Sequence, residues 1–338
     1  SDVCSSDLVF PLHKRYRWAV IGTGTIARKF LSDLSRIPEA EVYAVCSRSL
    51  SRAREFGEDY GASAFYDDVL AMAEDQNVDI VYVATPHTEH FSNAITCMEN
   101  GKAVLVEKPM AVNSEQARKM MECARRNNVF LMEAMWSRLF PAFRTLVKWV
   151  AMGRMGQIRN ISADFGFFNT HGPEERLLNP ALGGGATLDV GPYVIWAAAS
   201  LVGLPAKVQA MGRLGETGVD EHTIINLQHS MGVTSQLMCG IDGKTPQQLI
   251  ITGTEGWIWV PDFWHADTLI YQPRGESDEE VLSFPYEGLG YQFQINEVMD
   301  CVSKGFTESP RVPLSMSVSI MEVMDEVRRQ IGVRYAMD

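Results

Sequence analysis

Two short polar segments each follow an apolar run, and both contain side chains that could take part in proton transfer. Glu107-Lys108-Pro109 follows the run 103–106, and Thr85-Pro86-His87 follows the run 80–84. Short apolar runs that end at proline are typical of buried parallel strands. Ligands of open α/β sheets lie at the carboxyl ends of such strands. A lysine in that position could hydrogen-bond a reacting oxygen, although residue type alone favours an ordinary surface lysine.

A glycine-rich turn lies between the first apolar run, 18–21, and a stretch of helical spacing, 26–37. The turn, Gly22-Thr23-Gly24-Thr25-Ile26-Ala27, has G-x-G-x-x-A spacing. Its first glycine permits a tight turn, its second lets the backbone approach a pyrophosphate, and the small third residue lets the helix pack on the strand. The helix N-terminus then offers N–H groups to phosphates. Because the turn opens an alternating series of strands and helices, it predicts a dinucleotide site rather than a purely structural turn.

The end of the next predicted strand favours NADP(H) over NAD(H). Chains that bind NAD usually place Asp or Glu about 20 residues beyond the turn, where it accepts the ribose 2′-hydroxyl. Here Ser47 and Arg48 occupy that place, and Arg52 lies one helical turn further on. Two arginines could bind a 2′-phosphate through charge-assisted hydrogen bonds. The alternative is two solvated arginines on a charged helix.

The composition excludes several classes of protein. The 338 residues include 30 basic and 42 acidic side chains, and the formal net charge of −12 opposes binding to nucleic-acid phosphates. The six cysteines have no metal-ligand spacing, so we expect reduced thiols, no metal site and a cytoplasmic protein. No apolar run approaches the ~18 residues of a membrane span. Residues 1–14 lack a signal-peptide pattern, and we interpret them as a disordered leader or a cloning remnant.

The apolar pattern predicts two domains. Over 15–138, strands alternate with helices, which is typical of the doubly wound parallel sheet of a Rossmann domain. After residue 155, strands follow one another with short turns, which indicates an antiparallel sheet within a second domain, 139–338. The predicted strands are 18–21, 42–46, 80–84, 103–106, 129–132, 158–168, 207–214, 222–229, 234–241, 248–260, 268–272 and 281–284. The predicted helices are 26–37, 50–60, 89–100, 114–127, where Ser114 is the expected cap, 187–201 and 314–331, the last packing back on the first domain.

Four motifs together resemble the glucose–fructose oxidoreductase, inositol dehydrogenase and MocA family (Gfo/Idh/MocA). They are the glycine turn 22–27, Thr85-Pro86-His87-Thr88-Glu89-His90, Glu107-Lys108-Pro109, and the run 183–191, Gly-Gly-Gly-Ala-Thr-Leu-Asp-Val-Gly. Segments 130–138 and 216–220 are most similar to the branch of dimeric dihydrodiol dehydrogenases and NADP-dependent D-xylose 1-dehydrogenases. The resemblance implies an α/β N-terminal Rossmann domain and an α+β C-terminal domain with a large, mostly antiparallel open sheet.

The resemblance also implies site roles. Lys108 would be the catalytic lysine beside the nicotinamide. Many members carry a histidine four residues after the aspartate that corresponds to Asp189, whereas this chain has Tyr193. Tyr193 is therefore the predicted proton donor or acceptor, with packing in the domain interface as the alternative. Asp189 is the third predicted catalytic residue, because Asp189 and Tyr193, at i and i+4, are expected to share a helix face and act together. We also expect the charge of Lys108 to lower the pKa of Tyr193.

Further residues are predicted to line the cleft. The predicted cofactor-binding residues are Gly22, Gly24, Thr25, Ile26, Ala27, Ser47, Arg48, Arg52, Thr85, Pro86, His87, His90, Glu107, Lys108, Trp136 and Arg138. The predicted substrate-binding residues are Lys108, Trp136, Phe168, His171, Asp189 and Tyr193. A core position for Trp136 and a solvated loop position for His171 are the alternatives. For the aromatic residues at 257–264 we expect core or interface packing rather than sugar stacking.

We therefore predict an NADP-dependent oxidoreductase that transfers a hydride between nicotinamide and a hydroxyl or carbonyl carbon of a sugar, polyol or trans-dihydrodiol. NAD is the less favoured cofactor. Two alternatives stay open: an NAD-dependent glycosidase of the same fold that uses transient oxidation, and a non-enzymatic NADP-binding regulator. Ser47 argues against the first alternative, and the presence of Lys108 and Tyr193 argues against the second. We expect a homodimer or tetramer formed through the C-terminal sheet, without nucleic-acid or membrane partners.

Overall fold

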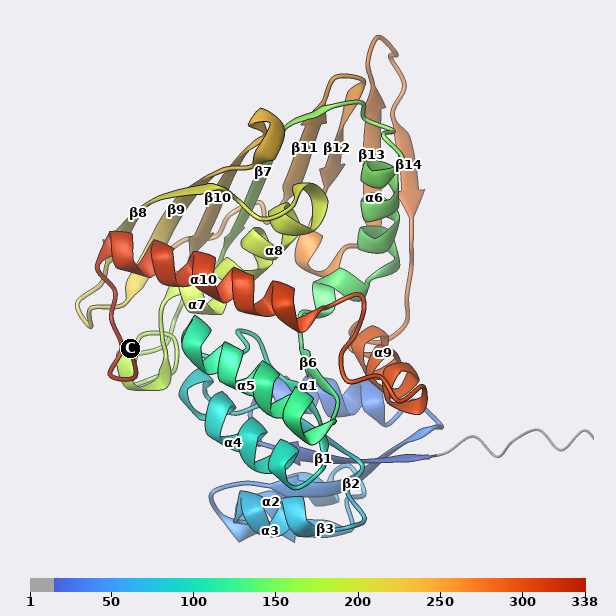
Figure 1. Cartoon of the computed structure of the whole chain (residues 1–338), viewed down its shortest axis with the longest axis vertical. Coiled ribbons are helices and arrows are strands. Elements are labelled where there is room, and N and C mark those ends of the chain that lie inside the picture. Colours follow the sequence, from blue (N-terminus) through green and yellow to red (C-terminus); the bar gives the residue numbers. More distant parts are fainter. Residues whose placement is uncertain (1–14) are drawn as a thin grey trace, which may run out of the picture.

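The computed structural model describes residues 15–338 and contains two sheets, one above the other in Figure 1. The first sheet is parallel, with the strand order β3-β2-β1-β4-β5-β6. Its strands are β1 (Tyr16–Ile21), β2 (Ala40–Cys46), β3 (Ala64–Tyr66), β4 (Ile80–Val83), β5 (Ala103–Val106) and β6 (Leu131–Glu133). The connecting helices are α1 (Thr25–Leu34), α2 (Leu50–Glu58), α3 (Val69–Glu74), α4 (His87–Glu99) and α5 (Ser114–Asn127). This confirms the predicted Rossmann architecture, whereas the prediction for residues 1–14 falls outside the described range.

The strand order explains where a ligand would bind. Strands β2 and β3 extend the sheet on one side of β1, and β4, β5 and β6 extend it on the other side. The strand order therefore reverses between β1 and β4, and a ligand crevice is expected at their carboxyl ends. Strands β4 and β5 are buried at every position, as expected for strands covered on both faces. The glycine turn follows β1, the Thr85 segment follows β4, and the Lys108 segment follows β5, so all three meet at this edge.

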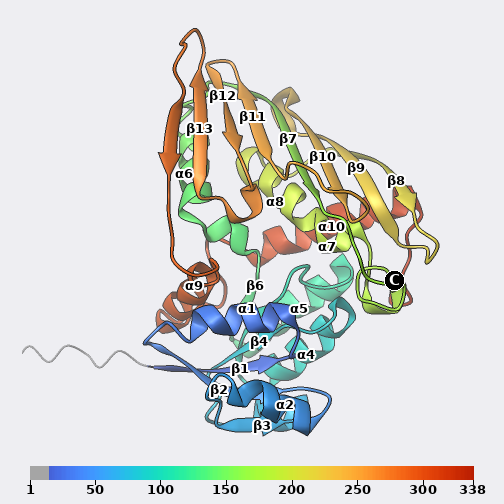
Figure 2. The ribbon, with the colours of Figure 1, turned by 180° about the vertical axis from the view of Figure 1, so that it is seen from behind.

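The second sheet has eight strands in the order β14-β13-β12-β11-β7-β10-β9-β8. They are β7 (Ile158–Gly166), β8 (Lys207–Leu214), β9 (Asp220–Gln228), β10 (Thr234–Gly240), β11 (Leu249–Gly253), β12 (Gly256–Val260), β13 (Thr268–Pro273) and β14 (Glu280–Ser283). The pairing is antiparallel except between β7 and β10, which confirms a mostly antiparallel sheet. Helices α6 (Pro141–Ala151), α8 (Gly191–Val202) and α10 (Leu314–Ile331) lie on one face, and the view from behind shows the other face (Figure 2).

Two predicted elements are each divided in the structure. The strand 248–260 is the hairpin β11–β12, in which Gly253 pairs with Gly256 across a two-residue turn. The helix 187–201 is divided into α7 (Ala186–Asp189) and α8, and the segment 180–189 meets α8 at an angle of 42°. Pro192 explains this division, because it has no N–H to continue the hydrogen-bond ladder of α7.

Several smaller features were missed from the sequence. The short elements β3 and α3 were not predicted, nor were α6, α9 (Gln292–Ser303) and the 3-10 turn η1 (Trp136–Leu139). The cap of α5 is Asn113 rather than Ser114, because the Asn113 side chain accepts the N–H of Gln116. Helix α10 lies against α5, where Arg118 and Glu322 form an ion pair of 2.8 Å. Within residues 15–338 no single helix is long and apolar enough to cross a membrane, and only the bent pair 180–189 with α8 reaches that length and apolarity together.

Candidate active site

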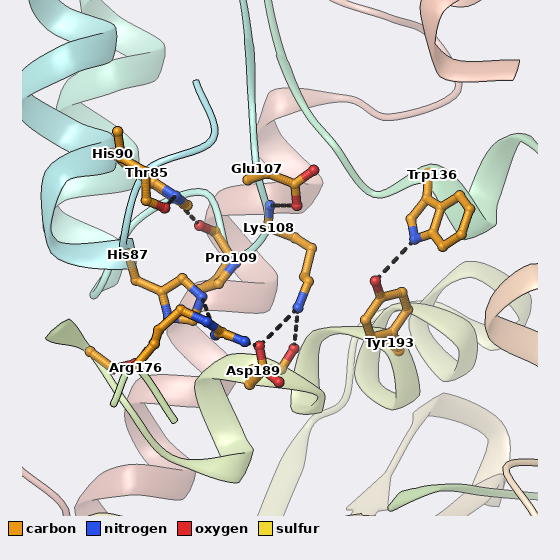
Figure 3. Close-up of polar contacts among 11 residues, drawn as sticks. Thr85, His87, His90, Glu107, Lys108, Pro109, Trp136, Arg176, Asp189 and Tyr193 are labelled. Carbon is orange, nitrogen blue, oxygen red and sulfur yellow. Dashed lines mark hydrogen bonds and ion pairs between the residues drawn. The ribbon is translucent and has the colours of Figure 1, made fainter. Parts of the chain in front are cut away.

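Lys108 extends from the end of β5 to the end of α7 (Figure 3). Its Nζ donates to the backbone carbonyl of Asp189 at 2.5 Å and lies 3.3 Å from Oδ1 of the same residue. The Lys108 side chain is 13% exposed and that of Asp189 is 7% exposed. An ion pair so well shielded from water interacts more strongly than a surface pair. The fold thus brings two predicted catalytic residues, 81 positions apart, into direct contact.

Arg176, which the sequence analysis missed, gives Asp189 a second cationic partner. Its Nη1 donates to Oδ1 of Asp189 at 2.8 Å and lies 3.5 Å from Nε2 of His87. The Nδ1 of His87 lies 2.9 Å from the carbonyl of Gly183. A neutral imidazole with its proton on Nδ1 satisfies both contacts, because Nε2 is then an acceptor. No spacing pattern singles out Arg176 in its loop, so only the folded structure identifies it.

The charges around Asp189 set its ionisation and that of His87. Burial would raise the pKa of the Asp189 carboxyl, but the positive charges of Lys108 and Arg176 hold it well below its usual range. Burial lowers the pKa of His87 well below its usual value, and the charge of Arg176 acts in the same direction. Asp189 is therefore a carboxylate at neutral pH, and His87 is a neutral imidazole.

Tyr193 lies among aromatic side chains and not beside Asp189. The indole Nε1–H of Trp136 donates to the Tyr193 hydroxyl at 2.9 Å (Figure 3). The ring of Trp136 is stacked on Tyr291, with centroids 4.5 Å apart and an interplanar angle of 10°. The Nζ of Lys108 lies 5.1 Å from the centre of the Tyr193 ring. The expected shared helix face of Asp189 and Tyr193 is wrong, because the chain bends between α7 and α8.

The pKa of Tyr193 is raised overall, although we expected the charge of Lys108 to lower it. Burial raises the pKa of the Tyr193 hydroxyl, and the negative charge of Glu107 raises it further. Glu107 itself accepts the hydroxyl of Tyr82 and, at 3.2 Å, the backbone N–H of Lys108. The Trp136 N–H has the opposite effect, because it stabilises the phenolate. Tyr193 is therefore a phenol at neutral pH, and its own O–H is available to donate.

His90 joins the ends of β4 and β5. Its two ring nitrogens lie 2.9 Å from the carbonyl of Pro109 and 3.0 Å from that of Thr85. Burial lowers the pKa of His90 to about 4. A neutral imidazole has one N–H, so it donates to one of these carbonyls at a time. These contacts give His90 a structural role at the turn that carries Lys108, and its predicted cofactor contact stays a prediction.

The glycine turn fits a dinucleotide pyrophosphate. Gly22 has φ of +108°, and a Cβ on it would lie 2.4 Å from the carbonyl oxygen of Ala84, so this position requires glycine. A Cβ on Gly24 would meet no atom of the described chain within 4 Å, so a ligand can approach the backbone there. Helix α1 begins next to Gly24 with no acidic side chain in its first turn. The N–H groups of residues 25–27 are those that a helix leaves free for an anion.

The predicted 2′-phosphate site adjoins this turn. The N–H of Gly22 donates to the carbonyl of Cys46 at 2.9 Å, which places the end of β2 beside the turn. Ser47 follows directly, and the side chains of Arg48 and Arg52 are exposed. Neither arginine forms an ion pair with an acidic residue of the described chain. Their guanidinium groups are therefore available to a ligand.

Three predicted cleft residues do not contact Lys108, Asp189 or Tyr193. Phe168 is 67% exposed, and His171 is exposed on a loop. The guanidinium of Arg138 lies 5.2 Å from the ring of Phe143 and 6.0 Å from that of Trp196. Burial lowers the pKa of Arg138 to about 10. Arg138 is thus packed between α6 and α8, and the structure does not bring these three residues into the cluster around Lys108.

The aromatic residues at 257–264 lie on two sides of the second sheet. Both tryptophans of β12 alternate with fully buried residues and are half-buried on the outward face. Trp264, in the 3-10 turn η4 (Phe263–His265), lies on the side of the site. Its ring centroid is 5.2 Å from that of Phe165 and 6.0 Å from that of Trp136. Phe165 in turn lies 5.1 Å from the ring of Tyr193, so these rings form an apolar wall beside the phenol.

Two family models match the chain. Residues 16–135 match the GFO/IDH/MocA oxidoreductase family with an NAD-binding Rossmann fold, and residues 143–259 match the GFO/IDH/MocA C-terminal domain. The mouse trans-1,2-dihydrobenzene-1,2-diol dehydrogenase is 37% identical over 330 residues, which cover 95% of this chain and 98% of that protein. The human protein of the same name is 34% identical over 333 residues, with the same coverage of both chains.

Solved structures share the whole fold. The aldose-aldose oxidoreductase from Caulobacter crescentus, complexed with glycerol, has a TM-score of 0.86 at 23% identity and covers 94% of this chain and 97% of its own. KijD10, a 3-ketoreductase from Actinomadura kijaniata in complex with NADP and TDP-benzene, has a TM-score of 0.84 at 27% identity. That match covers 94% of this chain and 98% of KijD10.

Proposed function

The chain belongs to the Gfo/Idh/MocA family of oxidoreductases, and we propose that it is an NADP-dependent dehydrogenase that acts on a CH–OH group of a trans-dihydrodiol, sugar or polyol. The observation that carries this proposal is the position of Lys108 Nζ, 5.1 Å from the centre of the Tyr193 ring. Lys108 follows β5 at the sheet edge to which the glycine turn also belongs, and Tyr193 faces it from α8. A substrate oxygen between them would be within reach of two proton donors.

In this proposal the chain's own residues transfer the proton of the substrate hydroxyl. When bound, the nicotinamide supplies or accepts the hydride. In the reducing direction the Tyr193 O–H gives its proton to the substrate oxygen, while Lys108 hydrogen-bonds the same oxygen. In the oxidising direction the Tyr193 oxygen takes the hydroxyl proton back. The Trp136 N–H donates to that oxygen and so stabilises it when it carries the negative charge.

The preference for NADP rests on Arg48 and Arg52 beside the glycine turn. We expect Arg48→Ala to weaken NADP+ binding by about 1.5–3 kcal/mol, because a charge-assisted bond to the 2′-phosphate is lost. NAD+ binding should be nearly unchanged, because NAD+ has no 2′-phosphate. Dissociation constants from fluorescence titration of both cofactors provide the measurement. Equal losses for the two cofactors would contradict the preference, and Arg54→Ala, on the same helix, is the control.

The substrate class is tested by a screen with NADP+. The relatives named above suggest trans-dihydrodiols first, and the wall of Trp136, Phe165 and Trp264 offers apolar surface to a six-membered ring. Oxidation of a trans-dihydrodiol gives a ketone that enolises to a catechol, and oxidation of an aldose at C1 gives a lactone. NADPH formation with one of these classes, and the matching product, would support the proposal. No NADPH formation with any dihydrodiol, aldose or polyol would overturn it.

We also propose that two copies associate through the outward face of the second sheet. Residues that are paired across neighbouring strands lie on the same face of a sheet. Ile224 is paired with Met238, and Trp259 is paired with Ile250 and Ile270. These apolar side chains are half-buried or, for Ile224, 41% exposed. A second copy would cover them in a two-fold dimer. Light scattering at micromolar concentration should give a dimer mass for the wild type and a monomer mass for Trp259→Glu. A wild-type monomer would contradict this assembly.

A further inference from the structure

Asp33 is a buried carboxylate on α1 that binds a loop 256 positions away along the chain. The N–H of Leu289 lies 3.0 Å from both of its oxygens, and the N–H of Tyr291 donates to Oδ2 at 2.9 Å. Asp33 is 2% exposed, and it lies in the last turn of α1, where the helix dipole disfavours an acidic side chain. A carboxylate in such a place indicates a tertiary role, and here that role is to hold the loop 288–291.

The same loop packs tightly against the aromatic side of the site. Gly290 has φ of +98°, and a Cβ on it would lie 2.4 Å from the ring of Phe140 and 3.2 Å from that of Trp136. A Cβ on Gly288 would lie 2.5 Å from Asp33 Oδ1. The loop backbone is therefore in contact with the Asp33 carboxylate on one side and with aromatic rings on the other. A displacement of the loop would displace these rings, since packed interiors leave little free space.

Tyr291 transmits the position of the loop to Trp136. Its backbone is held by Asp33, and its ring is stacked flat on the indole, with an interplanar angle of 10°. The indole in turn donates its N–H to the Tyr193 hydroxyl. Asp33, the loop, the indole and the phenol thus form one continuous series of contacts from the nucleotide-binding domain to the site.

We propose that Asp33 is a positioning residue for the Tyr193 hydroxyl, acting through the loop 288–291 and the indole of Trp136. This inference rests on the proposed function, in which Tyr193 transfers the substrate proton. Asp33 touches neither Tyr193 nor Lys108, so its effect depends on the placement of the indole N–H. A small shift can misplace the hydrogen bond to a group that transfers a proton. Such a misplacement can lower the reaction rate strongly.

The pH dependence of the reaction should report this placement. Tyr193 is faced by titratable groups on other elements: Glu107, Lys108, Asp189, Arg176, Tyr82 and Tyr291. Of these groups only Tyr291 is bound to Asp33, and its ring is stacked on the indole. A shift in the profile after a substitution at Asp33 therefore reports the contacts of Tyr291 and the indole with Tyr193. Loss of the indole N–H would raise the pKa of Tyr193, because the phenolate would lose a hydrogen-bond donor. The rise of the oxidation rate with pH should therefore move to higher pH.

The test compares Asp33→Asn with the wild type in two backgrounds. We expect Asp33→Asn to lower kcat by about tenfold and to move the oxidation profile to higher pH, with NADP+ affinity little changed. In the Tyr193→Phe background the same substitution should lower kcat by less than about twofold, because groups that act as one unit are not additive. Asp75→Asn is the matched control, since Asp75 accepts the hydroxyls of Tyr43 and Tyr66 far from this loop. It should leave the pH profile unchanged.

Each outcome decides one claim. If Asp33→Asn lowers kcat by the same factor in both backgrounds, or leaves the pH profile unchanged, the positioning role is overturned while the proposed function stands. If Tyr193→Phe alone keeps wild-type turnover, the proposed role of Tyr193 fails first. If Asp33→Asn does not fold, Tyr291→Leu replaces it, because loss of the stacked ring should move the profile in the same direction. An unchanged profile in Tyr291→Leu would also overturn the inference.

Discussion

Asp189 and Tyr193 lie four residues apart in the sequence, but they occupy two chemically different halves of the site. Around Asp189 the partners are cations, with Lys108 and Arg176 within 3.3 Å of Oδ1. Around Tyr193 the partners are aromatic rings and one indole N–H. Burial raises the pKa of both groups, but the cations reverse this effect only at Asp189. The site thus holds an ionised carboxylate beside a protonated phenol, which is a pattern typical of acid and base roles assigned by environment.

Removal of the lysine that lies between the two halves should have the largest effect. We expect Lys108→Met to lower turnover by about 10²–10⁴-fold, because the substrate oxygen loses its hydrogen-bonding ammonium. NADP+ affinity should change little. Steady-state kinetics with a separate cofactor titration provide the measurement. Lys119→Met is the matched control, since Lys119 is 56% exposed and paired with Glu115 on the surface of α5. Similar losses in both variants would count against a special role for Lys108.

The aromatic half is tested by Tyr193→Phe, which keeps the ring and removes the hydroxyl. We expect turnover to fall by about 10²-fold, and the rise of the oxidation rate with pH to disappear or shift. The raised pKa of Tyr193 places that rise above neutral pH in the wild type, because oxidation needs the deprotonated acceptor. Near wild-type turnover with an unchanged profile would make Tyr193 a packing residue, and Lys108 would then have to take the proton.

A double variant tests whether Lys108 and Tyr193 act as one unit, because the turnover losses of the two single variants should then not multiply. We expect the double variant of Lys108→Met and Tyr193→Phe to be far less impaired than the product of the single effects. The reason is that each group serves the same substrate oxygen, so the second loss removes little that remains. Rates of the two single variants and the double variant at one pH complete the cycle. Multiplicative losses would show that Lys108 and Tyr193 act independently.

The charged half should also affect stability. Asp189→Asn leaves Lys108 and Arg176 without their counter-ion, and we expect a loss of about 2 kcal/mol at pH 7, reduced from that of a fully buried pair because Arg176 is 43% exposed. The folded-state pKa of Asp189 lies below its ordinary value of 3.8. The stabilisation is therefore complete above pH 3.8 and is lost as the pH falls through the folded-state pKa. Urea unfolding of the wild type and of Asp189→Asn at several pH values measures this stabilisation. A difference in unfolding free energy that stays the same in strong acid would show that it does not come from the ionised carboxylate.

Arg176→Ala should have the smallest effect of the set. Lys108 still pairs with Asp189 in this variant, so we expect a stability loss of about 1 kcal/mol or less. Arg28→Ala is the control, since the Arg28–Asp59 pair has both side chains more than half exposed. Urea unfolding at neutral pH compares the two variants. A loss at Arg176 as large as that of Asp189→Asn would show that Arg176, rather than Lys108, holds the carboxylate.

Much of the local architecture could be predicted from the sequence. The bounds of α5, β8 and α10 agree with the predicted ranges 114–127, 207–214 and 314–331, because apolar periodicity and the surrounding Gly, Asn and Pro residues define these elements locally. The glycine turn was predictable for the same reason, since its chemistry is contained in six consecutive residues. Lys108 was located because it follows an apolar strand.

The tertiary structure alone decided how these residues work together. The bend at Pro192 places Asp189 and Tyr193 in separate environments, although their spacing suggests a shared helix face. Arg176 and Tyr291 carry no local signal, and they join the site only because distant segments pack beside it. The pKa of Tyr193 rises and does not fall, because burial and Glu107 outweigh a lysine whose ammonium is bound to Asp189. The apolar periodicity of the sequence indicates which residues become buried. Contacts between distant segments determine which charges and hydrogen-bond partners surround each buried residue.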